Sequence, residues 1–136
     1  MAYAQWLTIQ IQNLLKKNDI RVQHAVLEWG KFYKTSKDVE VTTSQIEAVV
    51  IAPGSSESVS ACGRSDASSG TTGQFDIYEG AAKICTVKWD CPWGSKTNSF
   101  NIESYNIITS PYLVSVGNWN RDSGAIGTVP IVISQK

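Results

Sequence analysis

Apolar and polar residues alternate along most of this chain, and this alternation constrains the fold more than any other feature of the sequence. From residue 6 to residue 12 the aliphatic side chains occupy every second position, as in a β-strand with one buried face; they are Leu7, Ile9 and Ile11. Similar segments recur between turn signals rich in Gly, Asn, Asp and Pro, and no segment shows a helical stripe. The pattern therefore predicts an all-β chain, folded as a single-domain antiparallel β-sandwich over residues 1–136.

Further strands are expected wherever the alternation resumes, at residues 20–26, 45–51, 56–62, 74–78, 83–89, 100–102, 112–116 and 126–133. His24 falls on the apolar face of its strand, which favours a hydrogen-bonded, half-buried histidine over a catalytic one. Residues 34–44 are polar and are expected to form a loop. Pro130 cannot donate to a strand ladder, so its strand is predicted to lie at a sheet edge or to contain a bulge.

Charge balance argues against two classes of protein. Basic and acidic residues both number 12, whereas nucleic-acid-binding proteins normally carry a basic excess. Recruitment to anionic lipid needs clustered basic residues, and the only run is Lys16-Lys17.

No apolar run is long enough for a transmembrane helix, and Met1–Gln12 lacks the basic start and apolar centre of a signal peptide.

The inventory of reactive residues predicts a protein that is not an enzyme and has no metal or cofactor site. There is no Gly-x-Ser-x-Gly motif, no Cys-x-x-Cys spacing and only one histidine. A pairing of His24 with Cys62 or Cys91 in space stays open. We expect these cysteines and Cys85 to be buried or idle thiols, with a single internal disulfide as the alternative.

The stretch from Trp89 to Asn98 reads Trp-Asp-Cys-Pro-Trp-Gly-Ser-Lys-Thr-Asn. Its proline disfavours helix and its Trp-Gly pair permits a sharp turn, so a strand should end near Trp89 and a stiff loop should follow. Alternation assigns Trp89 to the core. The loop then presents Trp93 beside Lys96, and an exposed ring next to a cation predicts a binding surface.

Two other segments fit a binding role. Trp6 falls on the polar face of its strand, and Trp29-Gly30-Lys31 repeats the pairing of an aromatic ring with a nearby lysine. The glycine- and hydroxyl-rich segment Gly63–Gly73 could present backbone N–H groups to an oxyanion, the alternative being a plain mobile loop. Exposed tryptophans suit both membrane interfaces and stacking on sugars, so a lectin-like sandwich that binds carbohydrate is a rival interpretation.

Many short motifs, in order and covering nearly the whole chain, resemble the aegerolysin family. They are Ala2-Tyr3-Ala4-Gln5-Trp6, Trp29-Gly30-Lys31, Cys62-Gly63-Arg64-Ser65-Asp66-Ala67, Gly70-Thr71-Thr72-Gly73, Phe75-Asp76, the stretch Trp89 to Asn98, and Ser123-Gly124-Ala125-Ile126-Gly127. The Ala67-Ser68-Ser69 centre of the glycine-rich loop is closer to filamentous-fungal members than to mushroom members.

The resemblance implies a compact β-sandwich similar to actinoporins, which binds sphingolipid-containing membranes. The lipid would be ceramide phosphoethanolamine, sphingomyelin with cholesterol, or both. Many members act as the docking component for a larger partner with a membrane-attack-complex/perforin domain, which then forms the pore. Members lack a signal peptide yet are found outside the cell, so this chain is expected to be secreted or released without a classical signal peptide and to bind target membranes peripherally.

The same resemblance assigns lipid-binding roles to Trp6, Trp29, Trp93 and Lys96, and the hydroxyl-rich loop adds Asp66, Ser69 and Gly70 as candidate headgroup contacts. The tryptophans would face the membrane, Lys96 would lie beside the lipid phosphate, and the loop around Ser69 would contact the rest of the headgroup. Asp66 could accept a phosphoethanolamine amine or could merely form a turn, whereas a phosphocholine group would prefer an aromatic wall. Mushroom members carry an acidic residue where Ser69 stands, so strict selectivity for sphingomyelin with cholesterol is not implied.

A self-sufficient haemolysin is the remaining alternative to a docking component. The sequence gives it little support, because the N-terminal residues do not form an amphipathic helix pattern that could line a pore.

Overall fold

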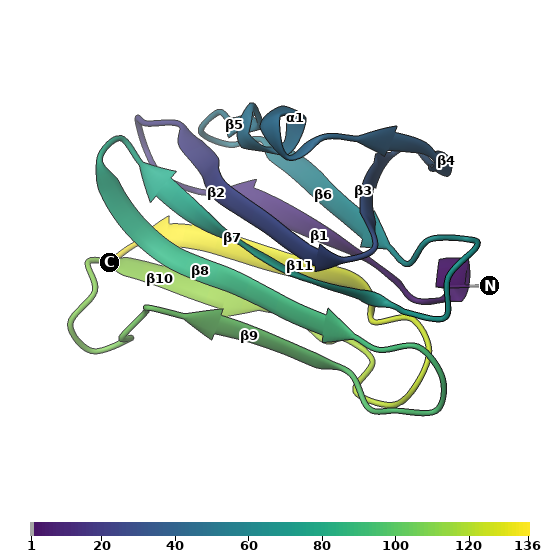
Figure 1. Ribbon diagram of the computed structural model, residues 1–136. Helices are drawn as coiled ribbons and strands as arrows, with labels where there is room; N and C mark the ends of the chain where they lie inside the picture. Colours follow the sequence, from purple (N-terminus) through teal and green to yellow (C-terminus); the bar gives the residue numbers. More distant parts are fainter. Residues whose placement is uncertain (1) are drawn as a thin grey trace.

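Two β-sheets pack face to face in the computed structural model, which describes residues 2–136 (Figure 1). Sheet A has the strand order β10-β11-β1-β6-β3-β4 and sheet B the order β5-β2-β7-β8-β9. The strands of sheet A are β1 (Trp6–Asn13), β3 (Lys31–Lys34), β4 (Ser36–Val41), β6 (Ser56–Cys62), β10 (Tyr112–Val116) and β11 (Gly127–Gln135). Those of sheet B are β2 (Ile20–Trp29), β5 (Val50–Ile51), β7 (Thr71–Glu79), β8 (Ala82–Cys91) and β9 (Ser99–Glu103). Two short helices complete the described chain, the 3-10 turn η1 (Ala2–Ala4) and α1 (Thr43–Glu47).

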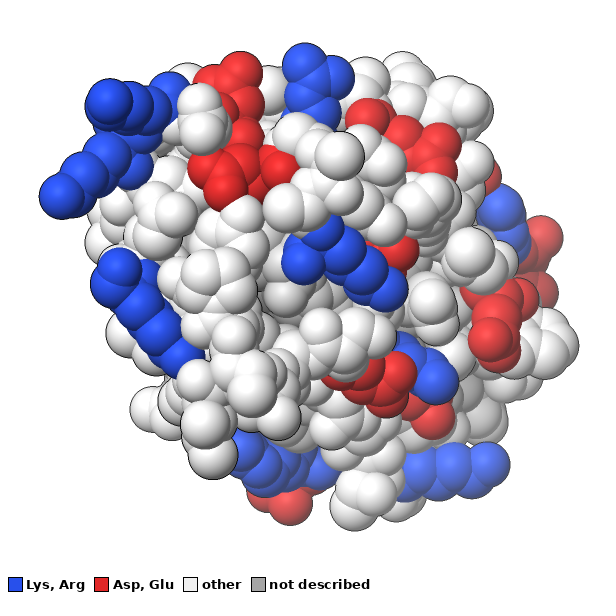
Figure 2. Space-filling view, turned by 90° about the vertical axis from the view of Figure 1, so that its left-hand side faces the viewer, with Lys and Arg blue, Asp and Glu red and all other residues white. Residues whose placement is uncertain are grey.

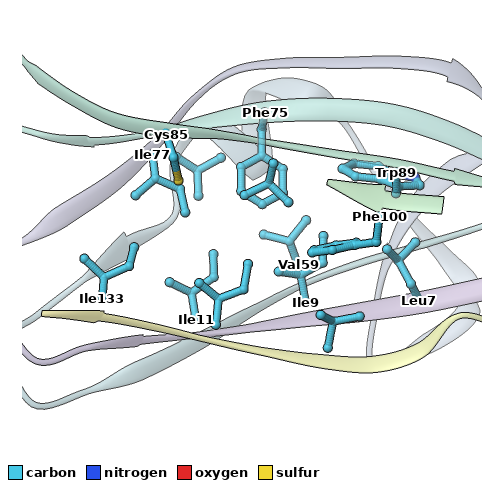
Figure 3. Close-up of a cluster of buried hydrophobic side chains, with 14 of the residues drawn as sticks. Leu7, Ile9, Ile11, Val59, Phe75, Ile77, Cys85, Trp89, Phe100 and Ile133 are labelled. Atoms are coloured by element: carbon cyan, nitrogen blue, oxygen red, sulfur yellow. The ribbon is translucent and has the colours of Figure 1, made fainter. Parts of the chain in front are cut away.

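The prediction of an all-β sandwich is confirmed. Alternation along β1 places its aliphatic side chains between the sheets, where they face aromatic and aliphatic side chains of β7 and β8 (Figure 3). Trp89 belongs to this core, as predicted, with only 1% of its surface exposed. Strand neighbours run antiparallel, except that β1 and β11 are parallel. Removal of these apolar surfaces from water is the main stabilising contribution to such a fold.

The predicted face of His24 is wrong, because a β-bulge interrupts β2. The register between β2 and β7 shifts between Gln23 and Val26, and His24 has a positive φ of 53°. The extra residue reverses the alternation, so Ala25 and Leu27 pack against the core while Val26 is exposed. The imidazole is hydrogen-bonded, as expected, but its side chain is 63% exposed rather than half-buried.

The expectation that Pro130 marks an edge or a bulge is also wrong. Its strand, β11, lies inside sheet A between β10 and β1, in continuous register. Pro130 lies opposite Gly117, one residue beyond the last paired position of β10, so its missing N–H affects only the end of the β10–β11 ladder. Its carbonyl still accepts a hydrogen bond from the backbone N–H of Gly117, and a Cβ at Gly117 would meet the proline ring at 2.4 Å.

Residues 34–51 do not form the loop and the long strand that the sequence predicts for them. The polar segment contains the edge strand β4, and α1 occupies most of the first half of the expected strand. Thr42 and Gln45 form a capping box, in which each side chain bonds the other residue's backbone N–H. Only the two residues of β5 remain extended after the helix.

Gly30 takes the chain from one sheet to the other at the end of β2. Trp29 still pairs with β7 in sheet B, whereas Lys31 already pairs with β6 in sheet A. Gly30 has a φ of 91°, and a Cβ there would lie 2.4 Å from the carbonyl oxygen of Cys62. The Trp-Gly-Lys motif is therefore the point at which the sheets are joined.

Several connections gather at this end of the sandwich, on the right in Figure 1, which we call the pocket end: η1 and the segments 63–70, 92–98 and 117–126. The opposite end carries the C-terminus and the turns after β1, β7 and β9. Figure 2 shows that opposite end, where basic and acidic side chains are interspersed without a large patch of one sign.

Candidate functional site

A hollow of about 700 Å³ opens at the pocket end, and its size is typical of a site for a small ligand. Three segments that are distant in the sequence form its walls: the end of β2, the loop before β7, and the end of β8 with the loop that follows. The lining residues are 28–29, 68–70, 72, 90 and 92–96.

The floor of the pocket is the last cross-strand row on the outer face of sheet B. Trp29 pairs with Thr72 across β2 and β7, and Thr72 pairs with Asp90 across β7 and β8. Directly opposite residues share a face, so all three side chains point away from the core. The Thr72 hydroxyl donates a 2.9 Å hydrogen bond to Asp90 Oδ1 and so orients that carboxylate.

A second β-bulge places Trp29 on the same face of sheet B as Glu28. Leu27 pairs with Gly73 and Trp29 with the adjacent Thr72, so Glu28 is the extra residue between them. Both Glu28 and Trp29 line the pocket, although neighbours in a regular strand would point to opposite faces. Trp29 remains 59% exposed.

The loop after β8 carries Trp93 and Lys96 into the pocket wall, as the sequence predicted. Trp93 is 44% exposed, and Gly94 turns the chain with a φ of 89°. Asn98 holds the base of this loop, because its buried Nδ2 lies 3.0, 2.7 and 3.1 Å from the carbonyl oxygens of Asn120, Asp122 and Gly124. The tryptophan is thus presented by a loop that is bonded to the neighbouring connection rather than free in solvent.

The loop before β7 closes the pocket on a third side. A Cβ at Gly70 would lie 1.8 Å from the carbonyl oxygen of Cys91, so only glycine allows this loop to approach the end of β8. Farther along the loop, Arg64 donates two hydrogen bonds to Glu40, of 3.0 and 2.9 Å. These bonds hold the pKa of the Glu40 carboxyl below its ordinary value and raise that of the Arg64 guanidinium.

The pocket contains side chains of both charge signs that do not neutralise one another. Glu28 and Asp90 supply carboxylates and Lys96 an ammonium group. The ion pairs found within residues 2–136 involve Asp76 and Glu40, and none of them includes these three side chains. The site therefore offers separate partners for an anionic and a cationic group, beside two aromatic rings.

The structure brings five of the seven predicted site residues together: Trp29, Ser69, Gly70, Trp93 and Lys96. The other two lie outside the pocket lining. Trp6 is half-buried on the outer face of sheet A, where Lys37 Nζ lies 5.2 Å from its ring centroid. Asp66 is exposed in the turn that follows Arg64.

The sequence reasoning missed Glu28, Thr72, Asp90 and Ser95 as pocket residues. Asp90 and Ser95 belong to the Trp89–Asn98 stretch, so the polar residues of this predicted binding loop were the signal for them. Glu28 had no such signal, because the alternation expected from Ile20 to Val26 puts it on the apolar face, and the bulge after Gln23 reverses that alternation.

The suggested Cys–His pair does not form. Each group is bonded elsewhere: His24 Nδ1 lies 2.9 Å from Asp76 Oδ2, and the Cys91 thiol donates a 3.3 Å hydrogen bond to the Gly124 carbonyl. All three cysteines are buried free thiols, as predicted, and burial raises the pKa of Cys91 to about 11. Within residues 2–136 no group of three His, Cys, Asp or Glu side chains could hold a metal ion. None of the helices in that range has the length and apolar character needed to cross a membrane.

Comparison with known proteins gives consistent matches over the full length of the chain. The family model described as Aegerolysin matches residues 4–136. Asp-hemolysin from Aspergillus fumigatus is 48% identical over 136 residues, which are 99% of this chain and 96% of that protein. Ostreolysin A6 from Pleurotus ostreatus is 38% identical over 135 residues, covering 96% of this chain and 95% of its own. The crystal structure of RahU protein in complex with a TRIS molecule superposes with a TM-score of 0.89 at 33% identity, covering 99% and 98% of the two chains.

Proposed function

The chain belongs to the aegerolysin family, and on that premise we propose that it binds sphingolipid-containing membranes through its pocket end and acts on those membranes as the docking component for a pore-forming partner. Family membership makes it a lipid-binding, cytolysin-related protein. The proposal adds the lipid class, either ceramide phosphoethanolamine or sphingomyelin with cholesterol, and a partner with a membrane-attack-complex/perforin domain.

The observation that carries this proposal is the grouping of two exposed tryptophans and Lys96 around one pocket. A tryptophan that becomes fully buried gains up to roughly 4–6 kcal/mol, at ~25 cal/mol per Å² over about 150–250 Å². About half of each ring is still exposed here, so insertion at headgroup depth would contribute about 2–3 kcal/mol per ring. Two rings can therefore hold this domain on a bilayer without a basic patch.

Polar groups in the pocket give the insertion its headgroup preference. Lys96 provides a cation for the lipid phosphate, and the hydroxyls of Ser68, Ser69 and Ser95 provide further hydrogen bonds.

A self-sufficient haemolysin is the second candidate, because a relative that is 48% identical carries the name Asp-hemolysin. A docking component would instead bind vesicles without releasing their contents until the partner is added. In either case the protein would act outside the producing cell and bind the target membrane peripherally.

Vesicle sedimentation tests the lipid and the site together. Vesicles would contain phosphatidylcholine with sphingomyelin, with sphingomyelin and cholesterol, or with ceramide phosphoethanolamine, and glycan arrays would test the lectin alternative. We expect Trp93→Ala to weaken binding about 30- to 150-fold, as the loss of about 2–3 kcal/mol implies, and Lys96→Ala to weaken it about tenfold.

Matched controls come from the opposite end of the sandwich. Ile108→Ala removes an apolar side chain that is 85% exposed, and Lys17→Ala removes an exposed lysine from the turn after β1. Both should bind like the parent. Sphingolipid binding that survives Trp93→Ala and Lys96→Ala in folded protein, or glycan binding without vesicle binding, would show that the proposal is wrong.

A further inference from the structure

We propose that Glu28 and Asp90 form the ammonium-binding side of the pocket and make it select a headgroup that ends in a primary ammonium over one that ends in a quaternary ammonium. This inference rests on the proposed function, since it concerns the same pocket. It assigns a specificity role to two residues that resemblance to the family does not supply.

The position of Glu28 is the first argument. Glu28 follows the core-facing Leu27, so its carboxylate lies on the outer face of sheet B, and the extra residue in β2 places Trp29 on that same face beside it. Bulges of this kind commonly redirect a side chain beside a functional site. In a regular strand Trp29 would point to the opposite face, so the bulge is what puts the carboxylate and the aromatic ring side by side in one pocket wall.

The arrangement of charge is the second argument. Asp90 lies in the last cross-strand row of sheet B, Glu28 lies in the bulge beside that row, and Lys96 comes from the loop after β8. None of the three joins an ion pair within residues 2–136. A zwitterion of a phosphate and an ammonium group fits this pattern, with its phosphate at Lys96 and its cationic end at the carboxylates.

Hydrogen-bonding capacity decides between the two kinds of ammonium. A primary ammonium carries three N–H donors that must be satisfied when it leaves water, whereas a quaternary ammonium carries none and binds through aromatic faces. Asp90 Oδ1 accepts from Thr72, which leaves Oδ2 as an acceptor, and Glu28 offers both of its oxygens. These carboxylate oxygens can form charge-assisted hydrogen bonds with a primary ammonium but not with a quaternary ammonium.

Asp66 is not needed for this selectivity. It is exposed in the turn beside Arg64 and does not line the pocket. Glu28 and Asp90, rather than Asp66, would therefore contact the amine of the headgroup. The charge of Asp66 instead acts on Arg64, whose pKa it helps to raise.

The experiment compares affinities for matched vesicles of phosphatidylcholine that contain either ceramide phosphoethanolamine or sphingomyelin. The variants are Glu28→Gln, Asp90→Asn and the double variant, with Glu103→Gln as a control at the far end of β9. Vesicles with phosphatidylethanolamine, and competition by soluble phosphoethanolamine, distinguish a sphingolipid from other sources of the same headgroup. Thermal unfolding shows whether each variant is folded.

We expect the parent to prefer ceramide phosphoethanolamine, and the ratio of the two affinities to fall about tenfold in Glu28→Gln, the loss of one charge-assisted hydrogen bond. The double variant should lose more, and Glu103→Gln should keep the parent ratio. A double variant that binds with the parent ratio, while Trp93→Ala loses both lipids, would overturn this inference and leave the proposed function intact. A parent that binds neither vesicle would overturn both.

Discussion

Asp76 is a buried carboxylate on the outer face of sheet B, held from three sides. Thr86 donates a 2.6 Å hydrogen bond to Oδ1, Lys83 Nζ lies 3.6 Å from the same atom, and His24 Nδ1 lies 2.9 Å from Oδ2. Burial by itself would raise the pKa of Asp76, but these bonds and the charge of Lys83 outweigh it and hold that pKa below its ordinary value of 3.8. The ionised carboxylate therefore stabilises the fold.

The first prediction is a stability difference that depends on pH. At pH 7 the variant Asp76→Asn should lower the free energy of unfolding by about 1–3 kcal/mol, since a buried charged hydrogen-bond acceptor is lost. A carboxyl with a lowered folded-state pKa contributes stability above its unfolded value and loses it as pH falls through the folded value, so the difference should shrink between about pH 5 and about pH 2.

Urea unfolding of both proteins across that range measures the effect. Asp19→Asn, at an exposed aspartate in the turn after β1, is the matched control and should change stability little at any pH. A difference between parent and Asp76→Asn that is as large in acid as at pH 7 would contradict the assignment.

Gly70 and Gly80 allow a second prediction, because they separate steric clash from backbone strain. Alanine at Gly70 would place its Cβ 1.8 Å from the Cys91 carbonyl oxygen, whereas at Gly80 nothing lies within 4 Å and only the positive φ of 58° is unfavourable. We expect Gly80→Ala to cost about 1 kcal/mol and Gly70→Ala to cost about 2–3 kcal/mol and to open the pocket. Thermal unfolding measures both; equal losses would mean that the loop moves away without cost.

At the scale of elements, the side chain and backbone of Asn98 hold the two connections 92–98 and 117–126 together. Its side chain donates toward three carbonyl oxygens of the second connection, and its own backbone N–H donates to the Arg121 carbonyl at 3.1 Å. These bonds hold the base of the loop that carries Trp93, so they reduce the ordering that binding would otherwise require.

The third prediction follows from these hydrogen bonds of Asn98. Asn98→Ala should destabilise the protein by about 2–3 kcal/mol, because several buried hydrogen bonds are lost. Asn98→Asp should destabilise it more, because a carboxylate would face three carbonyl oxygens. In both variants, amide hydrogen exchange should become faster within both connections. Lipid binding should become weaker, because the loop that carries Trp93 is no longer held. Unchanged exchange in Asn98→Ala would show that other contacts hold the loop.

The sequence predicted secondary-structure elements well where a local sequence signal determined them. It predicted them poorly where the pairing of strands in the assembled sheets determined them. Alternation identified β1 and the core position of Trp89. Bulges have no such signal: one reverses the faces of β2 after His24, and the other turns Trp29 to the pocket face beside Glu28. The strand with Pro130 was predicted to lie at an edge or to contain a bulge, because the point at which its neighbour β10 ends is a property of the assembled sheet.

At the scale of the whole molecule, the pocket depends on where the two sheets bring strand ends together. Motifs around Trp29, Gly70 and Trp93 are distant in the sequence, yet they meet because β2 ends, β7 begins and β8 ends at the same end of the sandwich (Figure 1). Their identity could be predicted from the sequence, but not that Trp6 would lie outside the pocket on the outer face of sheet A.

The central claim is that the pocket end faces a sphingolipid bilayer, and site-specific fluorescence tests it directly. The native thiols are buried, and burial raises the pKa of Cys85 to about 12, so an introduced surface cysteine can be labelled selectively. An environment-sensitive dye would be attached to Thr97→Cys in the pocket-end loop, or to Thr109→Cys in the exposed loop at the opposite end.

On sphingolipid vesicles that contain a nitroxide-labelled lipid, we expect the dye at position 97 to shift to the blue and to be quenched, while the dye at position 109 keeps its emission in water. Quenching at position 109 without quenching at position 97, or equal quenching at both, would contradict the proposed orientation.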